Sequence, residues 1–239
     1  MELKINYLPE KYENIILPLM TINPKLTLGG SLALYLLDIM DYDFTNRKPD
    51  LDFSLLESLT EEELLSIKDF FDLSFVIRGN DYEINTENVD DNLQRQFTKT
   101  KPISHFLTKE IIQIYKPDLN AKPDGAEHWD KEYIIDFFNK DYLPSKEMIK
   151  IKYKDFELRL THPSVILSHK SKYAYDTRVG KQYKHFQDLQ TIDWKKYFQI
   201  VKHFHAVWVP VTDNKNIGYQ KISHYEWYDN TKIEAELPF

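Results

Sequence analysis

Hydrophobic and polar residues follow two different periods along the chain. Up to residue 162, short stretches that alternate with a period of two are mixed with helical stretches, which is typical of a sheet flanked by helices. From residue 163 onward, apolar positions recur with helical spacing. Strands are expected at residues 26–28, 50–55, 73–78, 82–85, 111–115, 133–138, 148–153 and 156–160. Helices are expected at 9–17, 32–40, from 60 onward, and at 163–175, 182–192 and 194–204.

Local signals indicate where several of these elements begin and end. Pro18 is expected to end the first helix, and Ser31 is expected to cap the start of the second. Pro163 suits the first turn of a helix. The aromatic tail from Trp208 onward shows no regular pattern. The predicted fold class is therefore α+β, with an α/β domain over residues 1–162 and a C-terminal helical domain with an aromatic tail over residues 163–239.

The amino-acid composition excludes several kinds of site. The chain has 239 residues and no cysteine, which excludes disulfides, thiolate zinc sites and cysteine nucleophiles. Its net charge of -7 does not favour general nucleic-acid binding, although a local basic strip would remain compatible with it. The N-terminus does not read as a signal peptide, and no apolar stretch is long enough to span a bilayer. We therefore expect a soluble, cytoplasmic protein without a membrane partner.

A glycine turn and a pair of acids carry the first chemical signal. Gly29, Gly30 and Ser31 join an expected strand to a helix, where backbone N–H groups can approach a phosphate. Asp50 and Asp52 follow on the next strand, and strand residues two apart point to the same face. Two carboxylates this close favour a shared divalent cation, because oxygen ligands suit magnesium. Each signal alone also fits a simple loop or a solvated strand face.

A third acid would complete a two-metal arrangement. Asp136 lies within an apolar strand, where an ionised acid needs a partner or faces a site. The alternative for Asp136 is a salt bridge to a core arginine. The long interval between Asp52 and Asp136 is poorly patterned, so Glu157 on a later strand stays a rival for the third carboxylate.

Taken together, these residues resemble the DNA polymerase β-type nucleotidyltransferase superfamily. The likeness covers roughly residues 26–194, and it is greatest to the AbiEii-like group of abortive-infection toxins. In that group an arginine precedes the acid pair, as Arg47 does here. The stretch PSVILSHK, ending at Lys170, resembles the group's helix with its lysine, and KHFQDL, which begins at Lys184 and includes Asp188, resembles its following motif.

The expected function follows from this resemblance and not from the residue pattern alone. It implies a nucleotidyltransferase-like mixed sheet, magnesium or manganese as cofactor, and transfer of a nucleotidyl group from an NTP to an RNA, protein or small-molecule acceptor. A role as a toxin in a toxin–antitoxin or phage-defence system, with an antitoxin partner, follows from the same resemblance. The NTP would be bound by Gly29, Gly30, Ser31, Arg47, Lys170 and Lys184. The alternative for Lys170 and Lys184 is a solvated helix face, and Asp188 is equally compatible with a structural role.

Other functions compete less well. A non-catalytic nucleotide-binding or partner-binding member of the same fold is the main alternative, because a fold does not fix a function. A glycosyltransferase fits the Asp-x-Asp pair but not the glycine turn before it. His203 and His205 have metal-like spacing only on a strand, and we interpret them as helical. The tail aromatics Trp208, Tyr219, Tyr225, Trp227 and Tyr228 can stack on bases, although core or interface packing is the commoner role.

Overall fold

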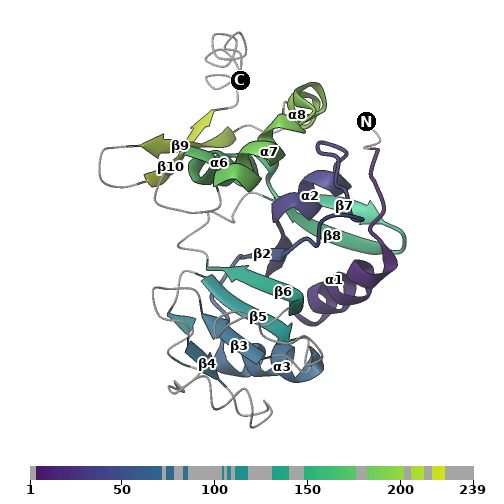
Figure 1. The fold of residues 1–239 in the computed structure, drawn as a ribbon, viewed down its shortest axis with the longest axis vertical. Helices are drawn as coiled ribbons and strands as arrows, with labels where there is room; N and C mark the ends of the chain where they lie inside the picture. Colours follow the sequence, from purple (N-terminus) through teal and green to yellow (C-terminus); the bar gives the residue numbers. More distant parts are fainter. Residues whose placement is uncertain are drawn as a thin grey trace.

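The chain folds as a mixed α/β structure in which helices flank one large sheet (Figure 1). The computed structural model describes residues 4–71, 74–77, 83–85, 104, 107–108, 111–117, 131–139, 148–175, 182–201, 206–212 and 217–223. Among the residues singled out from the sequence, those outside these ranges are His203, His205, Tyr225, Trp227 and Tyr228. The expected combination of a mixed sheet and flanking helices is confirmed.

Eight strands pair into this mixed sheet. They are β1 (Leu26–Leu28), β2 (Leu51–Leu55), β3 (Ser74–Ile77), β4 (Glu83–Asn85), β5 (Ile111–Pro117), β6 (Lys131–Phe138), β7 (Met148–Tyr153) and β8 (Phe156–Thr161). Their order across the sheet is β4-β3-β5-β6-β2-β1-β8-β7. The pairs β2–β6 and β1–β8 are parallel, and the other neighbours are antiparallel. Each strand overlaps a stretch that the sequence pattern predicted, although β5 and β8 end later and β6 begins earlier than expected.

The described helices lie in separate groups around the sheet. They are α1 (Glu10–Ile22), α2 (Gly30–Leu36), α3 (Glu61–Phe71), α6 (Pro163–Tyr175), α7 (Gln182–Gln190) and α8 (Trp194–Val201). Figure 1 shows α6, α7 and α8 together next to α2, with α3 beside β3 and β4. Among the described residues, no helix combines the length and apolar character needed to cross a membrane.

The expectation that Pro18 ends the first helix is wrong, because α1 runs through it to Ile22. Proline removes the hydrogen bond to the carbonyl four residues earlier, that of Asn14. Asn14 is exposed, so water can bond to this carbonyl. Leu19 and Met20 are buried in the core just after the proline. Their burial offsets the missing bond and keeps the chain helical.

The expectation that Ser31 caps the second helix is also wrong. Gly29 occupies the N-cap position of α2 without a side-chain cap, and the helix begins at Gly30. Ser31 therefore lies inside the helix. The helix ends at Leu36, earlier than the apolar stretch suggested, because Asp38 adopts a left-handed backbone with φ of 56°.

The hydrophobic core continues across the boundary placed near residue 162. Side chains from the C-terminal helices and their junctions belong to the same buried cluster as those of β1, β2, β6 and β8: Ile166, Leu167, Ile192, Tyr197, Ile200 and Val201. The backbone N–H of Asp193 also donates to the carbonyl of Ile39, at 2.7 Å. The residues after 162 thus complete the core of the residues before it.

The expectation of an irregular tail is wrong for its first part. Two antiparallel strands follow the helices, β9 (Ala206–Thr212) and β10 (Ile217–Ser223). Val207, Val209 and Val211 alternate along β9, a strand signal that the surrounding aromatic residues obscured. β9 lies against α6 (Figure 1). The C-terminal part is therefore helical with an added β-hairpin.

Candidate active site

A row of acids crosses the centre of the sheet. Asp52 on β2 and Asp136 on β6 are register partners on adjacent parallel strands, so their side chains point to the same face. Asp136 is buried, with 1% of its surface exposed, whereas Asp52 is half-buried. Asp50 lies two positions before Asp52 and immediately precedes β2, which begins at Leu51 rather than at residue 50 as expected. Asp52 and Asp136 are thus brought to one face of two neighbouring strands, and Asp50 lies close enough for its charge to act on Asp52.

The electrostatics of this row differ from those of ordinary surface acids. Burial, followed by the charges of Asp136 and Asp50, raises the pKa of Asp52 to about 7. The cations of Lys184 and Lys170 act in the opposite direction but more weakly. A carboxylate held this way favours a proton or a cation close by, because either would remove the repulsion.

The glycine turn is packed directly against Asp52. Gly30 has a left-handed φ of 60°, and a Cβ built there would lie 1.9 Å from Asp52 Oδ2. No other residue fits this position without displacing the carboxylate. The N–H of Gly29 donates to the carbonyl of Asp52, at 2.7 Å. The turn therefore fixes both the backbone and the side chain of the acid.

Buried hydroxyl groups lie beneath this turn. The hydroxyls of Thr27 and Thr161 lie 2.9 Å apart, and Thr161 also bonds the hydroxyl of Ser54 at 3.1 Å. Thr27 Oγ1 donates in addition to the carbonyl of Ser54, at 3.2 Å. Sequence reasoning missed these residues, although Ser54 is two positions after Asp52 on β2. They form a hydrogen-bonded polar base for the turn and the acid strand.

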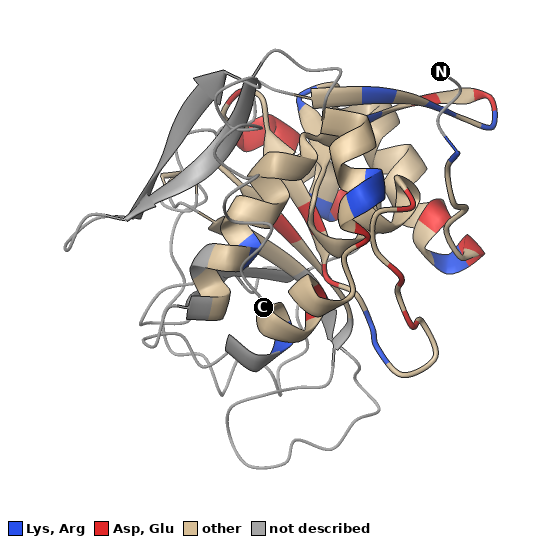
Figure 2. Cartoon of the chain, turned by 90° about the horizontal axis from the view of Figure 1, so that it is seen from above, with Lys and Arg blue, Asp and Glu red and all other residues tan. Residues whose placement is uncertain are grey.

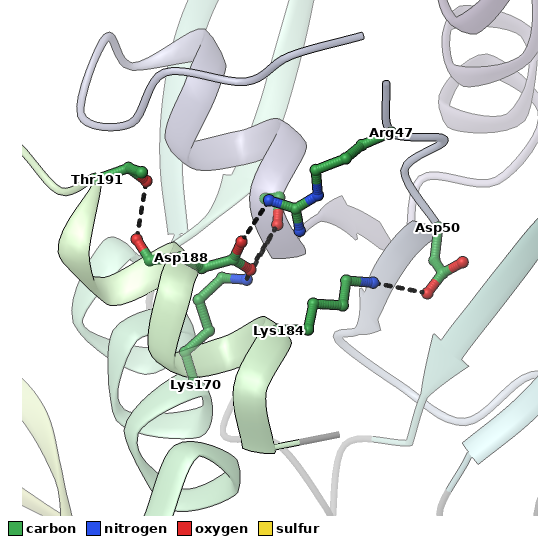
Figure 3. Close-up of polar contacts among 7 residues, drawn as sticks. Arg47, Asp50, Lys170, Lys184, Asp188 and Thr191 are labelled. Carbon is green, nitrogen blue, oxygen red and sulfur yellow. Dashed lines mark hydrogen bonds and ion pairs between the residues drawn. The ribbon is translucent and has the colours of Figure 1, made fainter. Parts of the chain in front are cut away.

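The basic residues of the C-terminal helices reach the same region (Figure 3). Lys170 on α6 is buried, and its Nζ lies 2.6 Å from Asp188 Oδ2 and 2.9 Å from Ser31 Oγ. Arg47 Nη1 lies 2.8 Å from Asp188 Oδ1. We call Ser31, Arg47, Lys170 and Asp188 the buried ion cluster. It joins α6 and α7 to the start of α2 and to the segment before β2.

Asp188 is the centre of this cluster. Burial by itself would raise the pKa of Asp188, but the charge of Lys170 and hydrogen bonds from Lys170 and Arg47 lower it below the usual value. The carboxylate is therefore ionised and paired with two cations. Lys170 is accordingly not a solvated lysine, since its cation already has a buried anionic partner.

Arg47 has a donor that the cluster does not use. Its guanidinium lies 5.1 Å from the ring centre of Tyr42, a cation–π contact. Its Nη2 atom is buried and makes no hydrogen bond to any described residue. A buried guanidinium N–H without an acceptor favours an anionic ligand.

Lys184 is the more accessible of the two lysines. Its Nζ lies 3.4 Å from Asp50 Oδ2, and the side chains are 41% and 24% exposed, respectively (Figure 3). A cation that is only partly buried can exchange a carboxylate for a phosphate at small cost. Lys184, which lies beside the acid row, is therefore the lysine better able to bind a phosphate group.

The rival for the third carboxylate lies elsewhere. Glu157 is exposed at the start of β8 and pairs with Lys150 of β7 at 2.9 Å. It precedes by three residues the position where β8 pairs with Leu28 at the end of β1. The geometry favours Asp136, which shares its register with Asp52, as the third acid of this site.

A cation site is not complete as the side chains stand. Within the described ranges, no three His, Asp or Glu side chains are grouped closely enough to hold a metal ion. Asp50 contacts Lys184, and Asp136 accepts a hydrogen bond from Gln113. The donor set nevertheless fits a hard divalent cation, because such an ion would relieve the repulsion that raises the pKa of Asp52.

Charge over the other described residues does not identify a macromolecular ligand. In Figure 2, basic and acidic positions are interspersed over the described helices and strands rather than gathered on a single basic face. Comparison of the chain with protein-family models, with curated proteins and with solved structures finds no match. The function must therefore be inferred from the site itself.

Proposed function

We propose that the chain is a metal-dependent nucleotidyltransferase that acts on an NTP and an acceptor hydroxyl, with RNA, protein and small molecules as candidate acceptors. The main support is the register pairing of Asp52 and Asp136 on adjacent parallel strands, with Asp50 beside them. The packing of Gly30 against Asp52 and the closeness of Lys184 to Asp50 add to it. Asp50, Asp52 and Asp136 would hold magnesium or manganese.

In the proposed reaction, the acceptor oxygen forms a bond to the α-phosphorus of the NTP. The bond from that phosphorus to the bridging oxygen of the β-phosphate breaks, and pyrophosphate leaves. The acceptor proton passes to a carboxylate oxygen of the acid row. A bound divalent cation would supply acidification of the acceptor hydroxyl and neutralisation of the triphosphate.

The basic residues would have different tasks. Lys184 and the unused Nη2 donor of Arg47 would bind phosphate oxygens; this is supported by the accessibility of Lys184 and by the lack of an acceptor for Nη2 among the described residues. Lys170 is engaged with Asp188, and its task would be to hold α6 against the start of α2. Ser31 would contribute through the same cluster rather than as a helix cap.

Calorimetry tests the proposed site. We expect magnesium or manganese to strengthen NTP binding by the wild type, and Asp50→Asn with Asp52→Asn to abolish that dependence. Asp155→Asn, at an exposed turn residue, is the matched control and should bind as the wild type does. Equal and metal-independent NTP affinity in the wild type and the double variant would exclude the site.

A second candidate is a non-catalytic nucleotide-binding or partner-binding protein with the same acid row. It is favoured by the existing contacts of Asp50 with Lys184 and of Asp136 with Gln113, and by the absence of a ready metal group among the described residues. Labelled NTPs incubated with total RNA and with cell lysate separate the two. Transfer of label supports catalysis, and metal-dependent binding without transfer supports the alternative.

A further inference from the structure

The acid row extends to a third strand through an amide. Gln113 of β5 is the register partner of Asp136, which in turn is the register partner of Asp52. These three residues therefore lie side by side across β5, β6 and β2 and point to the same face of the sheet. Gln113 Nε2 donates to Asp136 Oδ1 at 2.5 Å. Gln113 is 2% exposed, so water does not compete for this bond.

The position of Gln113 is rigid. β5 pairs with β6 on one side and with β3 on the other, so its backbone is held along both edges. Ile112 and Ile114, on either side in sequence, are buried on the opposite face. A glutamine at the centre of such a strand is costly to bury unless its amide is hydrogen-bonded. Asp136 provides that bond.

The amide of Gln113 is uncharged, and this matters for binding of a cation by the acid row. A lysine or arginine at residue 113 would support an ionised Asp136, but it would also cancel the charge that attracts a cation. An amide donor orients one carboxylate oxygen and supports the ionised form while leaving the net charge unchanged. Outer hydrogen bonds of this kind orient metal-binding carboxylates in proteins.

We propose that Gln113 is the positioning residue for Asp136, and that it fixes this carboxylate in the orientation in which the acid row binds a divalent cation. The proposal rests on the function proposed above, because it assigns a metal-binding role to Asp136. Gln113 itself touches neither the nucleotide nor the cation. Its removal should therefore weaken cation binding without removing any ligand.

The experiment measures manganese binding to the nucleotide-free full chain, with free Mn²⁺ followed by electron paramagnetic resonance. Gln113→Met keeps the length of the side chain and removes the donor. We expect its apparent Kd for Mn²⁺ to rise about 10- to 100-fold. In an Asp136→Asn background, Gln113→Met should cause no further loss, because the carboxylate that it orients is gone.

Two control variants separate positioning from general destabilisation. The side chain of Asn23 is buried, and its Oδ1 accepts a hydrogen bond from the backbone N–H of Lys25 at 2.9 Å. Asn23→Ala removes this acceptor at a position far in sequence from the three acids. It should lower the melting temperature without changing the Kd for Mn²⁺. Gln199→Met makes the same replacement at an exposed residue of α8 and should change neither quantity.

Each outcome decides a different point. Wild-type affinity for Mn²⁺ in Gln113→Met overturns the positioning role and leaves the proposed function standing. A wild type that binds Mn²⁺ no better than Asp50→Asn with Asp52→Asn overturns the proposed function itself. If Gln113→Met does not fold, the side-chain amide signals of Gln113 in the wild type are followed by NMR during a Mg²⁺ titration. They should move with the midpoint of metal binding, and unmoved signals in a metal-binding wild type overturn the proposal.

Discussion

At the scale of single residues, the candidate site is defined by groups that are unfavourable on their own. Asp52 is crowded by two acids and by burial, and Gly30 adopts a left-handed backbone so that the Asp52 carboxylate has room. Arg47 keeps a buried donor without an acceptor among the described residues. Such local costs are common where a ligand restores the balance.

The raised pKa of Asp52 predicts a pH dependence of stability. Its pKa is about 7 in the folded chain against a usual value of 3.8, so the folded state binds more protons between these values. Without divalent cations, the free energy of unfolding should fall as pH rises from about 4 to 7, by an amount on the order of 3 kcal/mol from this group. Asp52→Asn should remove this fall.

Chemical denaturation at a series of pH values, in the presence of a chelator, measures this effect. Asp155→Asn is the control and should keep the pH dependence of the wild type. Magnesium should restore wild-type stability near pH 7 and leave Asp52→Asn unaffected. An Asp52→Asn variant with the same pH profile as the wild type would show that the acid is not destabilised when it ionises.

Two neighbouring glycines allow a matched comparison. Gly30→Ala should cost about 1–2 kcal/mol for the left-handed backbone alone, and more because its Cβ would displace the Asp52 carboxylate. Gly29→Ala should be tolerated, since φ is -117° there and the nearest atoms to an added Cβ lie 3.4 Å away. Thermal unfolding and NTP titration of both variants check this, and equal losses would contradict the assigned contact with Asp52.

At the scale of elements, the buried ion cluster joins α6 and α7 to α2. Asp188→Asn would leave the cation of Lys170 in a buried place without its anion, which should cost about 3–5 kcal/mol of stability. Lys170→Met combined with Asp188→Asn should recover most of the loss. Lys184→Met, at the half-exposed lysine, should cost less than about 1 kcal/mol. Denaturant unfolding of the wild type, these three variants and the single variant Lys170→Met tests this, and a double variant whose loss equals the sum of its two single losses would contradict the pairing.

The sequence predicted elements well where their pattern is local. The alternating stretches that became β5, β6, β7 and β8 were identified, as were the two short stretches that became β3 and β4. The role of Ser31 could not be predicted, because its partner Lys170 lies 139 residues away. The hydrogen bond to Asp136 from Gln113 was equally hidden, because Gln113 lies 23 residues away and only a core arginine was considered as an alternative partner. Contacts between residues that are far apart in the sequence leave no periodic pattern in it, so the pattern cannot predict them.

At the scale of the whole molecule, the core extends across the boundary near residue 162. Ile166 and Leu167 of α6 and Tyr197 of α8 are buried in the same cluster as the sheet. We expect the full chain to unfold in one cooperative transition, and a fragment of residues 1–162 to lack cooperative unfolding. Circular dichroism during urea titration of both chains tests this. A fragment that unfolds as sharply as the full chain would establish a separate domain.

Transfer of label from an α-labelled NTP tests the central claim most directly, with total RNA and cell lysate as acceptors and magnesium or manganese present. We expect the wild type to transfer label, and Asp136→Asn to lose transfer while its melting temperature without metal stays unchanged or rises. Glu157→Gln should transfer label as the wild type does, because Glu157 pairs with Lys150 at the surface. Transfer that survives in Asp136→Asn but disappears in Glu157→Gln would contradict the account.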